Sequence, residues 1–174
     1  MRYTGRDPRF STWKWQGLKA LLVNIGWVFG QSIMIAIMSY PAFLINTKSM
    51  RGLLFLDAIG VIIWIIGYAC EGISDFQLYA FTHNAANRGR VMCSGLWRYS
   101  RHPNYFGEIL MWWGIYLIAL SVPYGWSTII APLIITLMLL FVTGIPWVEK
   151  ALEHNPEYEQ YKRKTSMLIP WFPK

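Results

Sequence analysis

Four long apolar segments dominate the pattern of hydrophobic and polar positions along the chain. They cover residues 20–45, 53–70, 105–122 and 127–147. A helix needs about 20 apolar residues to cross the hydrocarbon layer of a bilayer. A helix also satisfies its own backbone hydrogen bonds there, whereas an open strand does not. The pattern therefore predicts an all-α integral membrane protein, a bundle of about four transmembrane helices in a single membrane domain over residues 1–174.

The composition agrees with this prediction. Hydrophobic residues make up 55% of the chain and charged residues only 14%, whereas an ordinary soluble domain has about 25% charged residues. The N-terminal stretch MRYTGRDPRFSTWKWQGLK has no apolar core followed by a small-residue cleavage site, so we expect no signal peptide. Cys70 and Cys93 have no His or second Cys at ligand spacing, so we expect no metal site.

The distribution of Lys and Arg predicts the orientation. If all four segments cross, the N-terminal segment, the central loop 75–104 and the tail 148–174 share one side of the membrane. Together they carry fourteen of the sixteen Lys and Arg, and the other side has only Lys48 and Arg51. The positive-inside rule predicts that both termini and the central loop are cytoplasmic. Topology alone explains the net charge of +7, so we expect no nucleic-acid binding.

Three carboxylates accompany the second apolar segment. Asp57 lies near its non-cytoplasmic end, where we expect it to pair with Lys48 or Arg51. Glu71 and Asp75, in YACEGISDFQ, are four residues apart and would share one helix face. Ionisable groups near the membrane often belong to a functional site. The alternative is that Glu71 and Asp75 are simply solvated in the headgroup region, and the sequence leaves both readings open.

The central loop leads into the motif GLWRYSRHPNYFGE, which gathers hydrogen-bonding groups before an apolar helix. Pro103 suits the first turn of that helix, and Asn104 and Glu108 would project from one of its faces. If a helical turn forms before Pro103, Arg98, Arg101 and His102 lie close together, and we expect Arg98 and Arg101 to bind phosphates. Asn can bind an amide, and aromatic rings can stack on a planar ring. These residue types suit a nucleotide. The candidates in this region are Arg90, Trp97, Arg98, Tyr99, Arg101, His102, Asn104, Tyr105 and Glu108.

A structural alternative also fits this region. A positively charged loop with interfacial aromatic residues accounts for its Arg, Trp and Tyr. In that case Asn104 caps the helix and Glu108 pairs with Arg101 or Arg98.

The motif GLWRYSRHPNYFGE, a Trp-rich helix and EYEQYKRKTSMLIPWFPK together resemble the membrane family of the steroid 5-alpha reductases, specifically its bacterial branch. The resemblance covers nearly the whole chain. Sterol C14 and C7 reductases have a similar HPNY, whereas isoprenylcysteine and phospholipid methyltransferases share RHP followed by Tyr and Gly. The segment Asn104 to Glu108 matches the reductase form NYFGE, and Asp75 lies where the reductases have an acidic residue.

The resemblance implies an NADPH-dependent reductase of an activated C=C bond in a lipophilic, steroid- or isoprenoid-like substrate. The methyltransferase alternative implies S-adenosylmethionine, and a non-catalytic relative is the third possibility. The implied catalytic residues are Asn104, Tyr105 and Glu108. The implied cofactor-binding residues are Glu71, Asp75, Arg90, Trp97, Arg98, Tyr99, Arg101, His102, Asn104, Glu108, Tyr158 and Tyr161.

The tail and the N-terminal half qualify this expectation. Tyr158 and Tyr161 share a helix face that the resemblance places over the cofactor, whereas a surface helix would instead bring Lys162 to Lys164 to anionic lipid. Family members generally have further helices before this segment, and in the steroid reductases those helices bind the substrate. The resemblance therefore implies that the substrate-binding groups are missing, have been replaced, or are supplied by a partner chain or a second copy.

Overall fold

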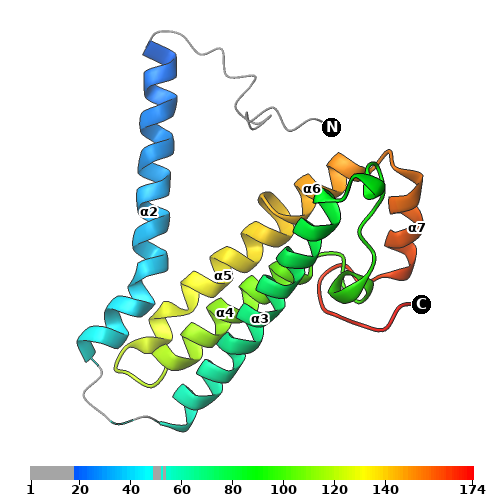
Figure 1. Cartoon of the computed structure of the whole chain (residues 1–174). Helices are drawn as coiled ribbons and strands as arrows, with labels where there is room; N and C mark the ends of the chain where they lie inside the picture. Colours follow the sequence, from blue (N-terminus) through cyan, green and yellow to red (C-terminus); the bar gives the residue numbers. More distant parts are fainter. Residues whose placement is uncertain (1–17, 49–51, 53) are drawn as a thin grey trace. The chain divides into compact units, whose positions relative to one another are not determined.

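The structure is a computed structural model that describes residues 18–48, 52 and 54–174, and helices account for most of them (Figure 1). These residues form no strand, and an isolated β-bridge pairs Ser100 with Ser166. The all-α prediction is therefore confirmed for the described part of the chain. The elements are α2 (Leu18–Lys48), α3 (Phe55–His83), η1 (Ala85–Asn87), η2 (Gly95–Arg98), α4 (Pro103–Ala119), η3 (Gly125–Ile129), α5 (Ile130–Leu137), the π-helical turn η4 (Met138–Val142), α6 (Ile145–Leu152) and α7 (Pro156–Lys164).

Three helical segments are long and apolar enough to cross a membrane. They are Leu21–Lys48, Phe55–His83 and Gly125–Leu152. The predicted segment 105–122 corresponds to α4, which has 17 residues and is shorter than the roughly 20 residues that a crossing helix needs. An integral membrane protein is thus supported, whereas the fourth crossing and the side of each terminus stay predictions.

Two predicted boundaries differ from the structure. The second segment does not end at residue 70, because α3 continues to His83 and carries Glu71 and Asp75. The loop predicted to begin at residue 75 therefore begins at Asn84. The end of the second apolar segment marks where contact with lipid ends. The backbone hydrogen bonds of α3 continue beyond it, because neither Pro nor a competing cap interrupts the helix there.

The last predicted segment is also not one continuous α-helix. It passes from α5 through η4 to α6, with a break at Gly144. Pro146 has no N–H for the carbonyl of Val142, and the Trp147 Nε1–H donates to that carbonyl instead, at 2.7 Å. The break is therefore compensated within the same segment.

The predicted single domain is divided into two compact units, Met1–Met38 and Ser39–Lys174, which share α2 between them. In the first unit the side chains of residues 21–33 are exposed. The division lies close to Pro41, which is inside α2 and lacks the N–H that would bond the carbonyl of Ile37. The chemistry described below belongs to the second unit.

In the second unit α3, α4 and α5 run side by side, and α3 and α4 form the most extensive contact (Figure 1). Two glycine pairs bring α3 and α4 together, Gly60 with Gly114 and Gly67 with Gly107. A Cβ added to Gly67 would lie 2.6 Å from the carbonyl oxygen of Gly107, and one added to Gly60 would lie 2.7 Å from that of Gly114. Small residues allow this backbone approach, as in many membrane helix pairs.

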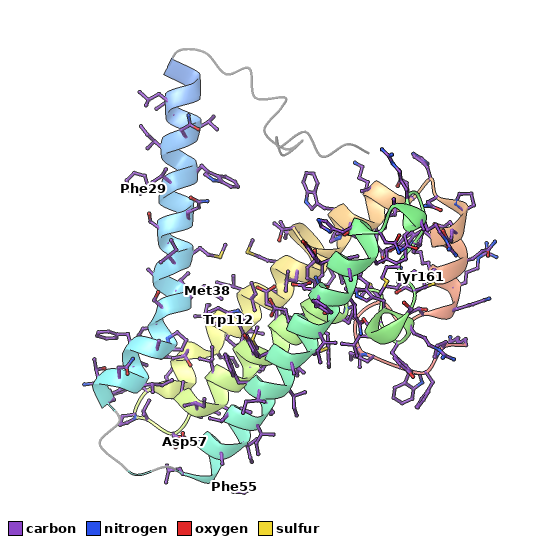
Figure 2. The ribbon with its side chains drawn as sticks, in the orientation of Figure 1. Phe29, Met38, Phe55, Asp57, Trp112 and Tyr161 are labelled. Atoms are coloured by element: carbon purple, nitrogen blue, oxygen red, sulfur yellow. The ribbon has the colours of Figure 1, made fainter. Side chains whose placement is uncertain are left out.

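Asp57 closes one end of this bundle, and Figure 2 labels it at the end opposite Tyr161. Its Oδ1 accepts from the Ser121 hydroxyl at 2.5 Å, and its Oδ2 accepts from the Leu54 N–H at 2.8 Å. Asp57 therefore caps α3 and bonds the end of α4. Its expected pairing with Lys48 or Arg51 stays a prediction. Arg51 itself lies outside the described residues.

Candidate functional site

The central motif is held on the end of α3. The Leu96 N–H donates to Gln77 Oε1 at 3.0 Å, and the Trp97 Nε1–H donates to the Ser74 carbonyl at 3.0 Å. Gly95 has a φ of +62°, and a Cβ there would meet the Gln77 side chain at 2.5 Å. The predicted helical turn does form as η2, and these bonds fix it against α3.

The tail packs against the same loop. Tyr158 and Tyr161 share a buried face of α7, as predicted, with ring centroids 6.1 Å apart. The Tyr161 hydroxyl lies between the carbonyls of Trp97 and Ser100 and donates to both, at 3.1 Å to Ser100. Burial raises the pKa of both phenols, so they remain protonated donors at neutral pH. The surface-helix alternative concerns the opposite, exposed side of α7, which carries Lys162, Arg163 and Lys164, and it stays open.

Glu149 on α6 connects three cations or potential cations. Its Oε1 bonds the guanidinium of Arg101 and lies 3.6 Å from Nε2 of His102, and its Oε2 lies 3.4 Å from Nζ of Lys162. Arg101 is 8% exposed and His102 2% exposed. Burial lowers the pKa of His102 to about 4, although the Glu149 carboxylate opposes the shift. His102 is therefore neutral at pH 7, and Arg101 is already paired.

A cavity of about 230 Å³ opens beside this cluster. Its wall is mostly apolar, but four of its residues have an enclosed polar atom with no hydrogen-bond partner in the described part of the chain. These atoms are Arg101 Nε, His102 Nε2, Asn104 Oδ1 and Tyr158 OH. Buried polar groups are normally paired, so these atoms are positions where water or a polar ligand in the cavity would bond. The ring of Tyr105 stacks on that of His102, with centroids 5.4 Å apart.

A second cavity of about 560 Å³ adjoins the first and shares Val91 and Tyr161 with it. This one is more open to solvent. Arg98 and Lys164 line it, and both side chains are exposed. Arg98 lines this second cavity and Arg101 the first, so the two predicted phosphate ligands do not line the same cavity.

The predicted pair of Asn104 and Glu108 is divided. Pro103 begins α4 and His102 caps it, so Asn104 lies inside the first turn and the capping alternative is wrong. Asn104 lines the first cavity. Glu108 is half-buried beside the carboxylates of Glu71 and Asp75, whose charges repel its own. The alternative pairing of Glu108 with Arg101 is also wrong, because Arg101 pairs with Glu149.

The remaining candidates take different places. Arg90 and Trp97 line the first cavity. Tyr99 lines neither cavity and contacts the C-terminal segment instead, where its ring meets Phe172 edge-on at 6.0 Å. Asp75 is exposed near the end of α3. In the described residues no three His, Cys, Asp or Glu side chains gather to hold a metal ion.

Comparison of the chain with known protein families gives one match. The model of a family described as a protein of unknown function, DUF1295, matches residues 1–165. The chain belongs to the DUF1295 family. No curated protein and no solved structure matches it.

In this DUF1295 chain, Glu149 is the functional candidate that sequence reasoning missed. A signal was present, because Glu149 is the acidic residue that follows the last apolar segment. The rule that singled out Glu71, an ionisable group at the membrane end of a helix, applies equally to Glu149. The sequence pattern could not show the partners of Glu149, because they lie in distant segments, the central loop and α7.

Proposed function

We propose that this chain is a membrane-embedded NADPH-dependent reductase of an activated C=C bond in a lipophilic, steroid- or isoprenoid-like substrate. The pair of adjoining cavities at one end of a membrane-length bundle is the observation that supports this proposal. One cavity is narrow with enclosed polar atoms, and the other is open with exposed cations. A dinucleotide has the matching division, with a planar amide-bearing ring at one end and phosphates further along.

The first cavity fits the ring end. Asn104 Oδ1 is an unpaired acceptor and Tyr158 OH an unpaired donor, which together suit a carboxamide. The stacked rings of His102 and Tyr105 offer an aromatic surface. At about 230 Å³ this cavity is smaller than the roughly 300–1,000 Å³ usual for ligand sites, and only together with its neighbour does it reach that range.

The second cavity fits the phosphate end. Arg98 and Lys164 are exposed cations on its wall, and cationic side chains form strong charge-assisted bonds with phosphates. Arg101 is less suited to this task, because Glu149 already neutralises it. We therefore assign phosphate binding to Arg98 and Lys164 in place of the expected Arg98 and Arg101.

The chain's own contribution to the reaction is binding, orientation and exclusion of water. NADPH, when bound, supplies the hydride. Asn104, Tyr158 and the His102–Tyr105 stack orient the reacting end, and Trp97 and Tyr161 close the cavity from the loop and from α7. The neighbouring membrane-length helices bring a lipophilic substrate from the bilayer, whereas a charged cofactor comes from the aqueous phase.

A second candidate, an S-adenosylmethionine-dependent membrane methyltransferase, is favoured by one specific observation. The carboxylates of Glu71, Asp75 and Glu108 lie close together on α3 and α4, beside the turn that carries Asn104. Negative charge of this kind stabilises a sulfonium cation. The small volume of the first cavity also suits a single compact ligand.

Isothermal titration of the purified protein in nanodiscs with NADPH, and separately with S-adenosylmethionine, distinguishes these functions. We expect NADPH to bind, and Arg98→Gln or Lys164→Gln to weaken binding by about 1–3 kcal/mol each, the range for a lost charge-assisted hydrogen bond. Lys150→Gln is the matched control, because Lys150 is exposed and lines neither cavity. Binding of S-adenosylmethionine alone would support the methyltransferase, and binding of neither would support a non-catalytic relative.

The location and partners form part of the same proposal. A bacterial inner membrane with both termini cytoplasmic would give the cavities access to NADPH, in agreement with the distribution of Lys and Arg. A partner chain or a second copy would supply the substrate-binding groups that the resemblance associates with additional helices.

A further inference from the structure

The last ten residues, 165–174, form what we call the C-terminal strap. It runs back along the central motif after α7 (Figure 1). The Arg101 N–H donates to the Ser166 carbonyl at 2.8 Å, and the Trp171 N–H donates to the Tyr99 carbonyl at 3.0 Å. These bonds tie the backbone of the strap to the loop before α4. Its side chains therefore have fixed positions.

Large apolar side chains on the strap point away from the protein. Ile169 is 62% exposed, Trp171 70% and Phe172 79%. Because hydrogen bonds hold the backbone of the strap, these side chains are exposed at fixed positions on the surface. Contiguous exposed apolar surface of this kind usually marks a contact with another molecule or with a membrane.

A hydrocarbon layer that begins at Phe55 places the strap at the level where that layer ends. About 20 helical residues cross that layer, and counted from Phe55 at the start of α3 they reach about Ser74. Trp97, in the turn η2, donates to the Ser74 carbonyl at 3.0 Å. The strap pairs with the residues that follow this turn, so it lies beside the bundle at the height of the interface.

The charges next to the strap complement an anionic surface. The last turn of α7 carries Lys162, Arg163 and Lys164, all exposed, directly before the strap. Basic residues beside exposed Trp and Phe are the combination found at the headgroup region of membranes. A second copy of the chain offers no such complement, because the last turn of its own α7 carries the same positive charge.

We propose that the C-terminal strap is a membrane-interface anchor, with Ile169, Trp171 and Phe172 inserted among the lipid headgroups and the end of α7 bound to anionic lipid. This role shares Lys164 with the phosphate site proposed above, and Thr165 and Pro173 of the strap line the same second cavity. It would hold the two cavities close to the bilayer surface, where a lipophilic molecule leaves the hydrocarbon layer.

Site-specific fluorescence tests the anchor. Single cysteines replace Ile169, Phe172 or, as a control, His154 in a Cys70→Ser, Cys93→Ser background, and each carries a polarity-sensitive nitrobenzoxadiazole label. His154 is suitable because its side chain is 94% exposed and precedes α7, at the other end of that helix from the strap. The labelled proteins are placed one per nanodisc in phosphatidylcholine, with or without phosphatidylglycerol, and headgroup-proximal doxyl lipids serve as quenchers.

We expect the labels at residues 169 and 172 to emit at shorter wavelength and to be quenched several-fold more strongly than the label at residue 154. Phosphatidylglycerol should increase this quenching, and Arg163→Gln with Lys164→Gln should remove the increase. Equal, water-like emission at all three positions would overturn the proposal. A blue shift without lipid quenching would overturn it too, since it would mean that protein covers the strap.

Discussion

The glycine contact between α3 and α4 makes a sharp prediction about stability. Gly67→Ala adds one methyl group where the two backbones meet. That methyl carbon would lie 2.6 Å from the Gly107 carbonyl oxygen and 2.8 Å from the Met111 nitrogen. Both are backbone atoms of α4, so neither can turn aside as a flexible side chain could.

The size of the effect follows from these distances. The shortest ordinary van der Waals contact of a Cβ atom is 3.4 Å, so the Gly107 carbonyl would have to retreat by about 0.8 Å. A helix cannot give way at one residue alone, so α4 would move as a unit and loosen its contacts along α3. Overpacking of this kind costs about 1–3 kcal/mol. We expect Gly67→Ala to lower the free energy of unfolding by that amount.

Thermal unfolding in detergent, followed by circular dichroism, measures the change, and Gly72→Ala is the matched control. Gly72 lies on the same helix, five positions further on, but a Cβ there meets no atom within 4 Å. Alanine favours helix over glycine by about 1 kcal/mol, so the control should melt at the wild-type temperature or above it. If both variants melt together, the close approach of α3 and α4 is not what holds this bundle.

Two further predictions concern the charged cluster. Glu149→Gln should destabilise the protein by about 2–3 kcal/mol, between the costs of breaking an exposed and a buried ion pair, because its partner Arg101 is only 8% exposed. Glu153→Gln, which breaks an exposed pair, should leave the melting temperature unchanged. Because burial holds the pKa of His102 at about 4 rather than 6.5, the unfolded chain takes up a proton first as the pH falls. The free energy of unfolding of the wild type should then fall by about 3 kcal/mol between pH 6.5 and 4. That of His102→Gln should fall by less over the same pH range. Parallel pH profiles of unfolding free energy for the two proteins would contradict this.

The apolar segments could be predicted because a helix that crosses the hydrocarbon layer needs apolar side chains along its length. A run of about 20 apolar residues is itself the signal of a crossing helix, and the described part of the chain contains three such helices. The end of α3 could not be predicted in this way, because the hydropathy pattern records contact with lipid and not the continuation of backbone hydrogen bonds. For the same reason the hydropathy pattern predicts one continuous helix for the last segment, because the residues of η4 and around the break at Gly144 are apolar too.

Within the candidate site, local spacing predicted what lies on one helix and no more. Tyr158 and Tyr161 share a face because they are three residues apart on α7. The separation of Arg98 from Arg101 depends on η2, whose path is set by Gln77 and Ser74 on α3. Such contacts between distant segments leave no periodic signal, and without them both arginines look equally suited to a phosphate.

The first cavity and the Gly67–Gly107 contact both depend on how α3 packs against α4. Leu78 and Phe81 on α3 form one part of the cavity wall, and Asn104 and Tyr105 on α4 form another. Gly67 and Gly107 set the distance between these two helices, with Gly107 two residues after Tyr105 and Gly67 eleven residues before Leu78. A displacement of α4 would therefore move Asn104 relative to Trp97, which stays bound to Ser74 on α3. It follows that close packing of small residues in the bundle sets the shape of a polar site at its end, and that ligand affinity should fall with the stability of the α3–α4 contact.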